Sequence, residues 1–223
     1  MAQDNIKETL DILNTLNEYL LSIPDDMLLS IDPRDNQSIV SSLQSIAQFN
    51  DSLSEFTGAS AKIEAQIKKY FSINPEEDDV VKESSKNGKN KRIVKELDKT
   101  EFYSLAENFT YKRPFGFVLG DSVYKGIKTW KSLYLQVLRE LRGLYPEKFL
   151  KLTEEEKFIT NRGNSSFAKN DQGLRIPEEL FSGFFVEVNL SANSIRDNIG
   201  NLLDYFDVDS ADFKISLREN RDA

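Results

Sequence analysis

The N-terminal part of the chain contains two stretches in which apolar residues recur at helical spacing. Each stretch places its apolar residues four and three positions apart and carries one asparagine in the same series, which gives two similar short seams: Ile6, Leu10, Leu13, Asn17 and Leu20, then Ile39, Leu43, Ile46, Asn50 and Leu53. This periodicity predicts two amphipathic helices. Residues 23–26 and 31–36, which contain Pro24 and Pro33, favour a break between them.

The two seams allow two arrangements of these helices. An asparagine at a core position of a coiled coil fixes register and partner number, so the seams are compatible with pairing between chains. Each seam is shorter than a reliable coiled coil, however, which favours an antiparallel helical hairpin or bundle within one chain. A helical stripe continues past Gly58 to about residue 72, either as a third helix or as one long helix.

Residues 74–96 differ in composition from the segments on either side. As far as residue 92 they are rich in charged residues, serine and asparagine, and they offer little to bury apart from Val80 and Val81. A segment of this composition cannot offset the entropy lost on ordering, so we predict a flexible charged linker. The chain then divides into a helical assembly or partner-binding module (1–73), the linker (74–96) and a binding domain (97–223).

The start of the second module mixes helix and strand patterns. Apolar spacing predicts a helix over residues 97–109. Residues 115–127 alternate around Gly120 and Asp121, which predicts a β-hairpin. Thr129 is placed to cap a helix that follows directly.

The rest of the module continues in the same mixed manner. Thr153 opens a capping-box sequence, which predicts a further helix, and residues 161–173 read as a polar loop. Residues 184–217 read as a strand, a helix and a strand. We therefore predict an α+β fold, in which an N-terminal helical hairpin or bundle and a flexible linker precede a small mixed α+β domain with a hairpin–helix and a strand–helix–strand.

The composition excludes several kinds of chemistry. The chain has no cysteine and no histidine, so it lacks disulfides, Cys/His zinc sites, thiolate nucleophiles and imidazole-based triads. No motif points to catalysis by the remaining side chains, and we expect no enzyme activity, no cofactor and no metal site. An acidic start and the absence of a long apolar run predict a cytoplasmic protein without a membrane segment.

One segment is basic although the whole chain has a net charge of −8. Residues 111–142 have a net charge of +5 with aromatic residues interleaved. Such a segment binds single-stranded nucleic acid when rings stack on bases and cations meet phosphates, here Lys112, Arg113, Lys125, Lys128 and Lys131. We favour the alternative in which the rings form the core and the cations are solvated. Residues 176–212, with a net charge of −7, are placed to neutralise part of the basic segment.

The junction between the strand at 184–188 and the next helix carries a polar series: Ser191, Asn193, Ser194 and Arg196. Side chains of these types cap a helix N-terminus, which is the interpretation that we favour. The alternative is an anion site, because free N–H groups at a helix N-terminus attract phosphate or carboxylate. The junction has no glycine-rich nucleotide-binding loop.

Three segments together carry a resemblance: residues 126–135 (GIKTWKSLYL), residues 185–195 and residues 212–215. They resemble a C-terminal α+β module of uncharacterised bacterial proteins, some of which are encoded near mobile-element or defence genes. That module has no assigned activity. The resemblance implies a bacterial or phage origin and a role as an appended binding domain.

From these patterns we predict a non-enzymatic binding or adaptor protein. Its N-terminal helices would mediate self-association or bind a protein partner. A nucleic-acid-binding protein that uses residues 111–142 is one alternative. The other is an acidic inhibitor that occupies a nucleic-acid site on another protein, which the charge of −8 allows.

Overall fold

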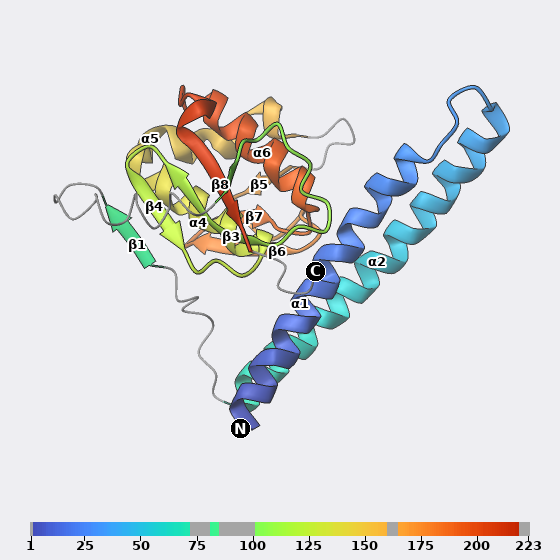
Figure 1. The fold of residues 1–223 in the computed structure, drawn as a ribbon, viewed down its shortest axis with the longest axis horizontal. Coiled ribbons are helices and arrows are strands. Elements are labelled where there is room, and N and C mark those ends of the chain that lie inside the picture. Colours follow the sequence, from blue (N-terminus) through green and yellow to red (C-terminus); the bar gives the residue numbers. More distant parts are fainter. Residues whose placement is uncertain (1, 72–80, 85–100, 160–164, 219–223) are drawn as a thin grey trace.

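The computed structural model describes residues 2–71, 81–84, 101–159 and 165–218. Two long helices, α1 (Ala2–Leu29) and α2 (Asn36–Phe71), form an antiparallel helical hairpin at the N-terminal end of the chain. The remaining elements form a C-terminal α+β domain, and the turn of the hairpin lies away from this domain (Figure 1). The predicted fold class is confirmed.

The helical hairpin is held together by a narrow apolar contact within one chain. Leu10 from α1 and Ile46 and Leu53 from α2 are buried. Asn17 donates a hydrogen bond from Nδ2 to Ser60 Oγ, 2.8 Å away, and therefore does not pair with the asparagine of the other seam. Both predicted seams thus contribute to the contact between α1 and α2.

Pro24 does not end α1 as the sequence analysis expected, and of the two alternatives at Gly58 the structure has the single long helix. Pro24 lies inside α1, which continues to Leu29, and Gly58 lies inside α2, which is one long helix. Proline removes one backbone donor, and the contacts of Asp25 and Asp26 with the C-terminal domain hold the last turns in place. The turn itself uses Asp35, whose Oδ1 accepts hydrogen bonds from the N–H groups at the start of α2.

The larger sheet of the C-terminal domain has five strands in the order β1-β4-β3-β8-β2, and its pairs are antiparallel. Their bounds are β1 (Val81–Ser84), β2 (Phe102–Tyr103), β3 (Pro114–Leu119), β4 (Ser122–Lys125) and β8 (Phe213–Leu217). Strands β3 and β4 are the predicted β-hairpin. Strand β1 comes from the predicted linker, whose other residues, 74–80 and 85–96, lie outside the described residues.

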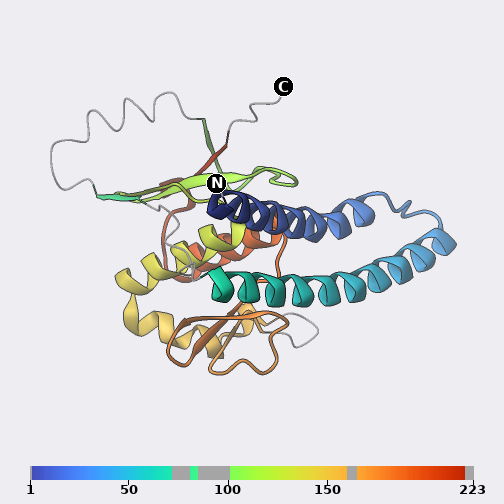
Figure 2. The same ribbon diagram turned by 90° about the horizontal axis from the view of Figure 1, so that it is seen from below.

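The smaller sheet has the order β5-β7-β6 and is also antiparallel. Its strands are β5 (Phe167–Ala168), β6 (Pro177–Phe181) and β7 (Phe184–Glu187). Helices α4 (Trp130–Leu144) and α6 (Ala192–Tyr205) lie between the two sheets (Figure 2). The domain therefore has three layers, sheet, helices and sheet, around one shared core.

Helix α4 is the centre of this core. Thr129 is its N-cap and accepts a hydrogen bond from Ser132 N–H, as the sequence predicted. Its apolar residues are buried on both flanks because sheets cover both: Trp130, Leu133, Tyr134, Leu135, Val137, Leu138 and Leu141. The Trp130 Nε1–H group donates to the Lys112 carbonyl at 2.7 Å, which ties the helix to the loop before β3.

Two predicted helices are wrong. The described part of residues 97–109 forms β2 and turns, because Phe109 N–H donates to Asn193 Oδ1 and Arg196 donates to the Glu107 carbonyl. The capping-box sequence at Thr153 lies in short 3-10 turns, η1 (Leu150–Glu154) and η2 (Glu156–Phe158), which follow the short helix α5 (Pro146–Phe149). A further 3-10 turn, η3 (Ser210–Asp212), precedes β8.

Candidate functional site

Acidic side chains of α1 attach the helical hairpin to the C-terminal domain. The Glu18 carboxylate accepts a hydrogen bond from the N–H group of Trp130, the first residue of α4. An unpaired N–H group and the positive end of the helix dipole both favour a carboxylate at this position. Glu18 thus acts as a cap for α4 although it belongs to a different element.

Asp25 repeats this arrangement two helical turns further along α1. Its Oδ2 atom accepts a hydrogen bond, 3.0 Å long, from the hydroxyl of Ser191, the N-cap of α6. Asp26 accepts from the Tyr111 hydroxyl at 2.7 Å, and Arg113 donates to Thr15 Oγ1 at 2.7 Å. Two carboxylates of α1 therefore meet the N-terminal ends of the two central helices of the domain.

The position of Glu18 changes its protonation. Burial raises the pKa of its carboxyl group from 4.5 to about 7, against the opposing effects of the Trp130 amide and of the positive charges of Arg113 and Arg218. A carboxyl group whose pKa lies near neutrality and that lines a cavity is a candidate functional group. Here its hydrogen bond to α4 also gives it a structural role.

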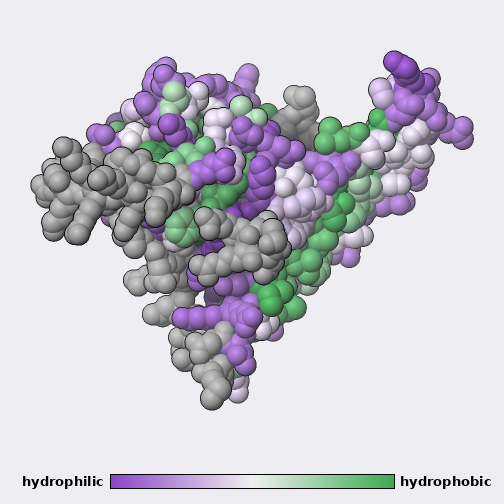
Figure 3. All heavy atoms as spheres, in the orientation of Figure 1, coloured by the Kyte–Doolittle hydropathy of each residue, from purple (hydrophilic) through white to green (hydrophobic). Residues whose placement is uncertain are grey.

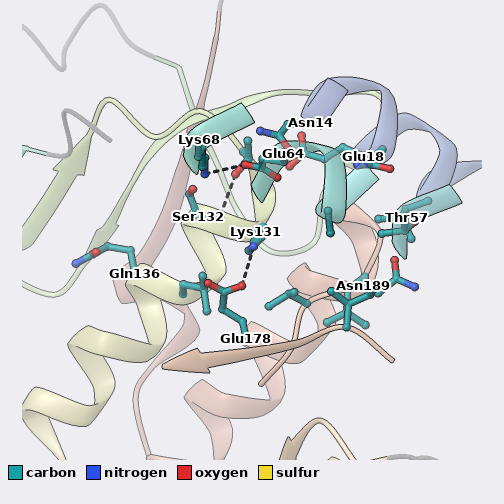
Figure 4. A pocket seen from close by; sticks show the side chains of 18 of the residues that line it. Asn14, Glu18, Thr57, Glu64, Lys68, Lys131, Ser132, Gln136, Glu178 and Asn189 are labelled. Carbon is teal, nitrogen blue, oxygen red and sulfur yellow. Dashed lines mark hydrogen bonds and ion pairs between the residues drawn. The ribbon is translucent and has the colours of Figure 1, made fainter. Parts of the chain in front are cut away.

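A cavity of about 350 Å³ lies beside Glu18, between the helical hairpin and the domain. Figure 4 shows Glu18, Thr57 and Glu64 on the hairpin side, and Lys131 on α4 opposite them. The charged side chains around it are mostly paired. Lys131 Nζ lies 2.9 Å from Glu178 Oε2 of β6. Lys68 Nζ lies 2.8 Å from Glu64 Oε1, one turn earlier in α2.

The three carboxylates that line this cavity, Glu18, Glu64 and Glu178, each have a partner. Catalysis by carboxylates needs an acid and a base placed on either side of a substrate. Glu64 and Glu178 are held by lysines, and Glu18 is hydrogen-bonded to α4. Among the described residues, no group of three or more carboxylates lies together in a geometry that could hold a metal ion.

A second polar cluster ties β1 to α4 at the edge of the larger sheet. Glu140 accepts hydrogen bonds from the Tyr124 hydroxyl, from Ser122 Oγ at 2.7 Å and from Lys82 Nζ at 2.7 Å. Burial opposes ionisation of Glu140, but these three donors together lower its pKa. Burial and the bond to Glu140 raise the pKa of Tyr124, so this hydroxyl is not an activated nucleophile.

The cations that the sequence analysis linked to nucleic acid have different neighbours. Lys112 is exposed and lies over the Tyr103 ring, whereas Arg113 faces α1. Lys131 meets Glu178, which belongs to the acidic segment 176–212. The two remaining candidates, Lys125 and Lys128, are half-buried at the end of β4 and just after it.

The aromatic residues of this segment are mostly core residues. Phe117, Tyr124, Trp130 and Tyr134 each have 2% or less of their surface exposed, so these rings have no face free for a base. Tyr111 and Phe115 are exposed, but the Tyr111 hydroxyl is bound to Asp26. The segment therefore uses its large rings for packing.

The polar series at the start of α6 is likewise engaged. Ser191 caps the helix by accepting from Ser194 N–H at 3.2 Å. Asn193 accepts from Phe109 N–H at 2.9 Å and donates to Thr110 Oγ1 at 2.9 Å. Since Arg196 donates to the Glu107 carbonyl at 2.8 Å, these side chains secure the loop before β3 and leave Asp25 at the helix end where an anion would bind.

Among the described residues, one apolar surface is the side of the helical hairpin that faces away from the C-terminal domain, which we call the outer face. Thr15, Glu18 and Asp25 face the domain, and at 100° per residue Leu16 and Leu20 lie on the opposite side of α1. Apolar side chains run along the hairpin (Figure 3). They include exposed Ile12 (63%), Leu16 (45%) and Ile63 (49%).

The sequence analysis identified neither the domain-facing side nor the outer face of the helical hairpin. The signal for the domain-facing side was the spacing of Glu18 and Asp25, which stand seven residues apart on one side of α1. The signal for the outer face was a second apolar series, parallel to the predicted seam, that includes Leu16 and Ile23. The predicted seam alone is too narrow to reveal that α1 has apolar residues on two sides.

Comparisons with known proteins found no matching protein-family model, no matching curated protein and no matching solved structure. Within the described part of the chain, no helix combines the length and the apolar character needed to cross a bilayer. The geometry of the chain itself is therefore the basis for a functional proposal.

Proposed function

We propose that this protein is a non-enzymatic, cytoplasmic binding protein of bacterial or phage origin that docks a protein partner on the outer face of its helical hairpin. The observation that carries this proposal is the exposure of large aliphatic side chains such as Ile12 and Leu16 along one side of α1. Contiguous exposed apolar surface of this kind marks interaction sites on folded proteins. The origin rests on the resemblance of the C-terminal segments alone.

The attachment of α1 to the C-terminal domain supports this proposal. Glu18, Asp25 and Asp26 hold the domain-facing side of α1 by hydrogen bonds to three separate segments of the domain. A surface that is already ordered loses less entropy when a partner binds. The domain then serves as a scaffold that presents the outer face in one orientation.

The two alternatives have weaker support. A nucleic-acid function through residues 111–142 would need stacking rings, and Phe117 and Trp130 are buried. An acidic inhibitor would need unpaired carboxylates on its surface, but Glu18 and Asp25 are directed into the domain. The exposed Asp204 and Asp207 are paired with Lys157 and Lys148. We therefore favour an apolar protein partner over both.

The proposal is tested by affinity capture from a bacterial lysate that also contains a differently tagged copy of the chain. The bait is compared with a Leu16→Lys/Ile63→Lys variant of the outer face, and nuclease is included. Both side chains are about half exposed, so the lysines need not disturb the fold. The matched control is Gln44→Lys/Ala65→Lys, which adds the same charge at exposed positions elsewhere on α2.

We expect a protein that is captured by the native chain and the control, resists nuclease and is lost with the outer-face variant. Capture that is unchanged by the two outer-face lysines would overturn the proposal. Capture that disappears with nuclease would instead support the nucleic-acid alternative.

A further inference from the structure

The outer face of α1 has the spacing of a coiled coil. Its positions alternate three and four residues apart over three heptads, and none of them is charged: Ile6, Thr9, Leu13, Leu16, Leu20, Ile23 and Met27. Alternating spacing of this kind keeps one seam facing a partner helix. Leu10 and Asn17 of the predicted seam make the contact with α2. In the second series Leu16 is 45% exposed and the other large side chains, three of them shared with the predicted seam, are half-buried, so each keeps part of its surface for another helix.

The outer face of α2 has the same spacing but a different size pattern. Large side chains recur at every seventh position, at Phe49, Phe56, Ile63 and Tyr70, and the positions between them are small or uncharged: Ser45, Ser52, Ala59 and Gln66. Phe49 and Phe56 are half-buried, while Ile63 and Tyr70 are 49% and 82% exposed. The face therefore alternates between large and small side chains.

On the outer face, α1 of one copy and α2 of another copy are complementary in side-chain size. Large aliphatic residues of α1 are the knobs that coiled-coil packing requires, and the small residues of α2, two serines and an alanine, leave the holes. The large residues of α1 and the small residues of α2 lie on one side of the same chain. In a twofold dimer, α1 of each copy can therefore pack against α2 of the other copy. A twofold dimer needs a self-complementary surface of this kind.

We infer that the occupant of the outer face is a second copy of this chain, so that two helical hairpins form a four-helix bundle. This inference rests on the proposed function, because it names the partner of the same surface. An uncharged seam along both helices calls for an equally uncharged partner, and a charged peptide or a nucleic acid does not supply one. The C-terminal domain lies on the other side of α1, at Glu18 and Asp25, and so leaves the outer face open to a second hairpin.

The test is the mass of the full chain in solution, measured by light scattering and analytical ultracentrifugation across a concentration series. We expect a species of twice the 25.6 kDa of one chain. The Leu16→Lys/Ile63→Lys variant is expected to weaken dimerisation at least about thirtyfold, the effect of losing about 2 kcal/mol at an interface hot spot. The Gln44→Lys/Ala65→Lys control should remain a dimer.

Circular dichroism of both variants is measured alongside, and equal helicity would assign the loss of the dimer to the surface rather than to unfolding. A native chain that is monomeric at every concentration would overturn the inference, as would a dimer that tolerates the two outer-face lysines. If the native chain is monomeric but still captures a different protein through the outer face, the second copy is excluded and the proposed function stands. A monomer without such capture excludes both.

Discussion

Glu18 is a residue whose charge state affects the attachment of the helical hairpin. Its pKa is about 7 in the folded chain and 4.5 without the surrounding protein. Between these values the folded state holds a proton that the unfolded state has lost, so stability falls as the pH rises from 4.5 to 7. Above pH 7 the buried, ionised carboxylate lowers the free energy of unfolding by the full amount of about 3 kcal/mol, since one pKa unit corresponds to about 1.4 kcal/mol.

Replacement by Glu18→Gln is expected to remove this dependence. Glutamine keeps an acceptor for the Trp130 N–H group but does not ionise. Urea unfolding across pH 5 to 8 should therefore show the variant gaining stability relative to the native chain as the pH rises. Glu55→Gln, at an exposed position of α2, is the control and should change little at any pH. Parallel curves for the native chain and Glu18→Gln would contradict the role assigned to burial.

At the scale of elements, two glycines show how the same substitution has opposite effects. Gly116 lies in β3, where an added Cβ would overlap the Tyr124 carbonyl of the neighbouring strand. Gly58 lies inside α2, where a Cβ would meet no atom within 4 Å. The close approach of the β3 and β4 backbones thus requires glycine at position 116, whereas glycine at position 58 only adds conformational entropy to the unfolded chain.

We expect Gly116→Ala to destabilise the protein by about 1–3 kcal/mol, the usual cost of forcing atoms into a packed site. Gly58→Ala should stabilise it by about 0.5–1 kcal/mol. Thermal and urea unfolding of the two variants measure both effects. Stabilisation by Gly116→Ala as well would show that the contact between β3 and β4 is looser than the structure indicates.

At the scale of the whole molecule, the contacts of α1 predict that the hairpin and the domain stay together when the chain between them is cut. A protease specific for glutamate is expected to cleave at Glu76 or Glu77, which precede β1, so that β1 stays with the domain. The two products should co-elute in gel filtration, because α1 and the domain share buried contacts that do not depend on chain continuity. A Glu18→Lys/Asp25→Lys variant should release the hairpin fragment after cleavage. Separation of the native fragments would show that the attachment is too weak to orient the outer face.

What the sequence by itself determined are the elements whose signals are local. The two long helices, the β3–β4 hairpin, the Thr129 cap and the closing strand–helix–strand all follow from periodicity or from a capping residue next to the element. In each case residues within a few positions of one another provide most of the signal. The α+β fold class follows from these elements.

The tertiary structure decided whatever depends on residues far apart in the chain. Glu18 and Trp130 are 112 positions apart, and no local sequence pattern predicts that the Glu18 carboxylate caps the helix that begins at Trp130. Pro24 was expected to end α1, but contacts of the following turn with the domain keep the helix intact. Distant contacts likewise turned residues 101–109 from a predicted helix into a strand and turns, since Phe109 N–H is bound by Asn193. Local propensities amount to a few tenths of a kcal/mol per residue, and buried hydrogen bonds and packing between distant segments outweigh them.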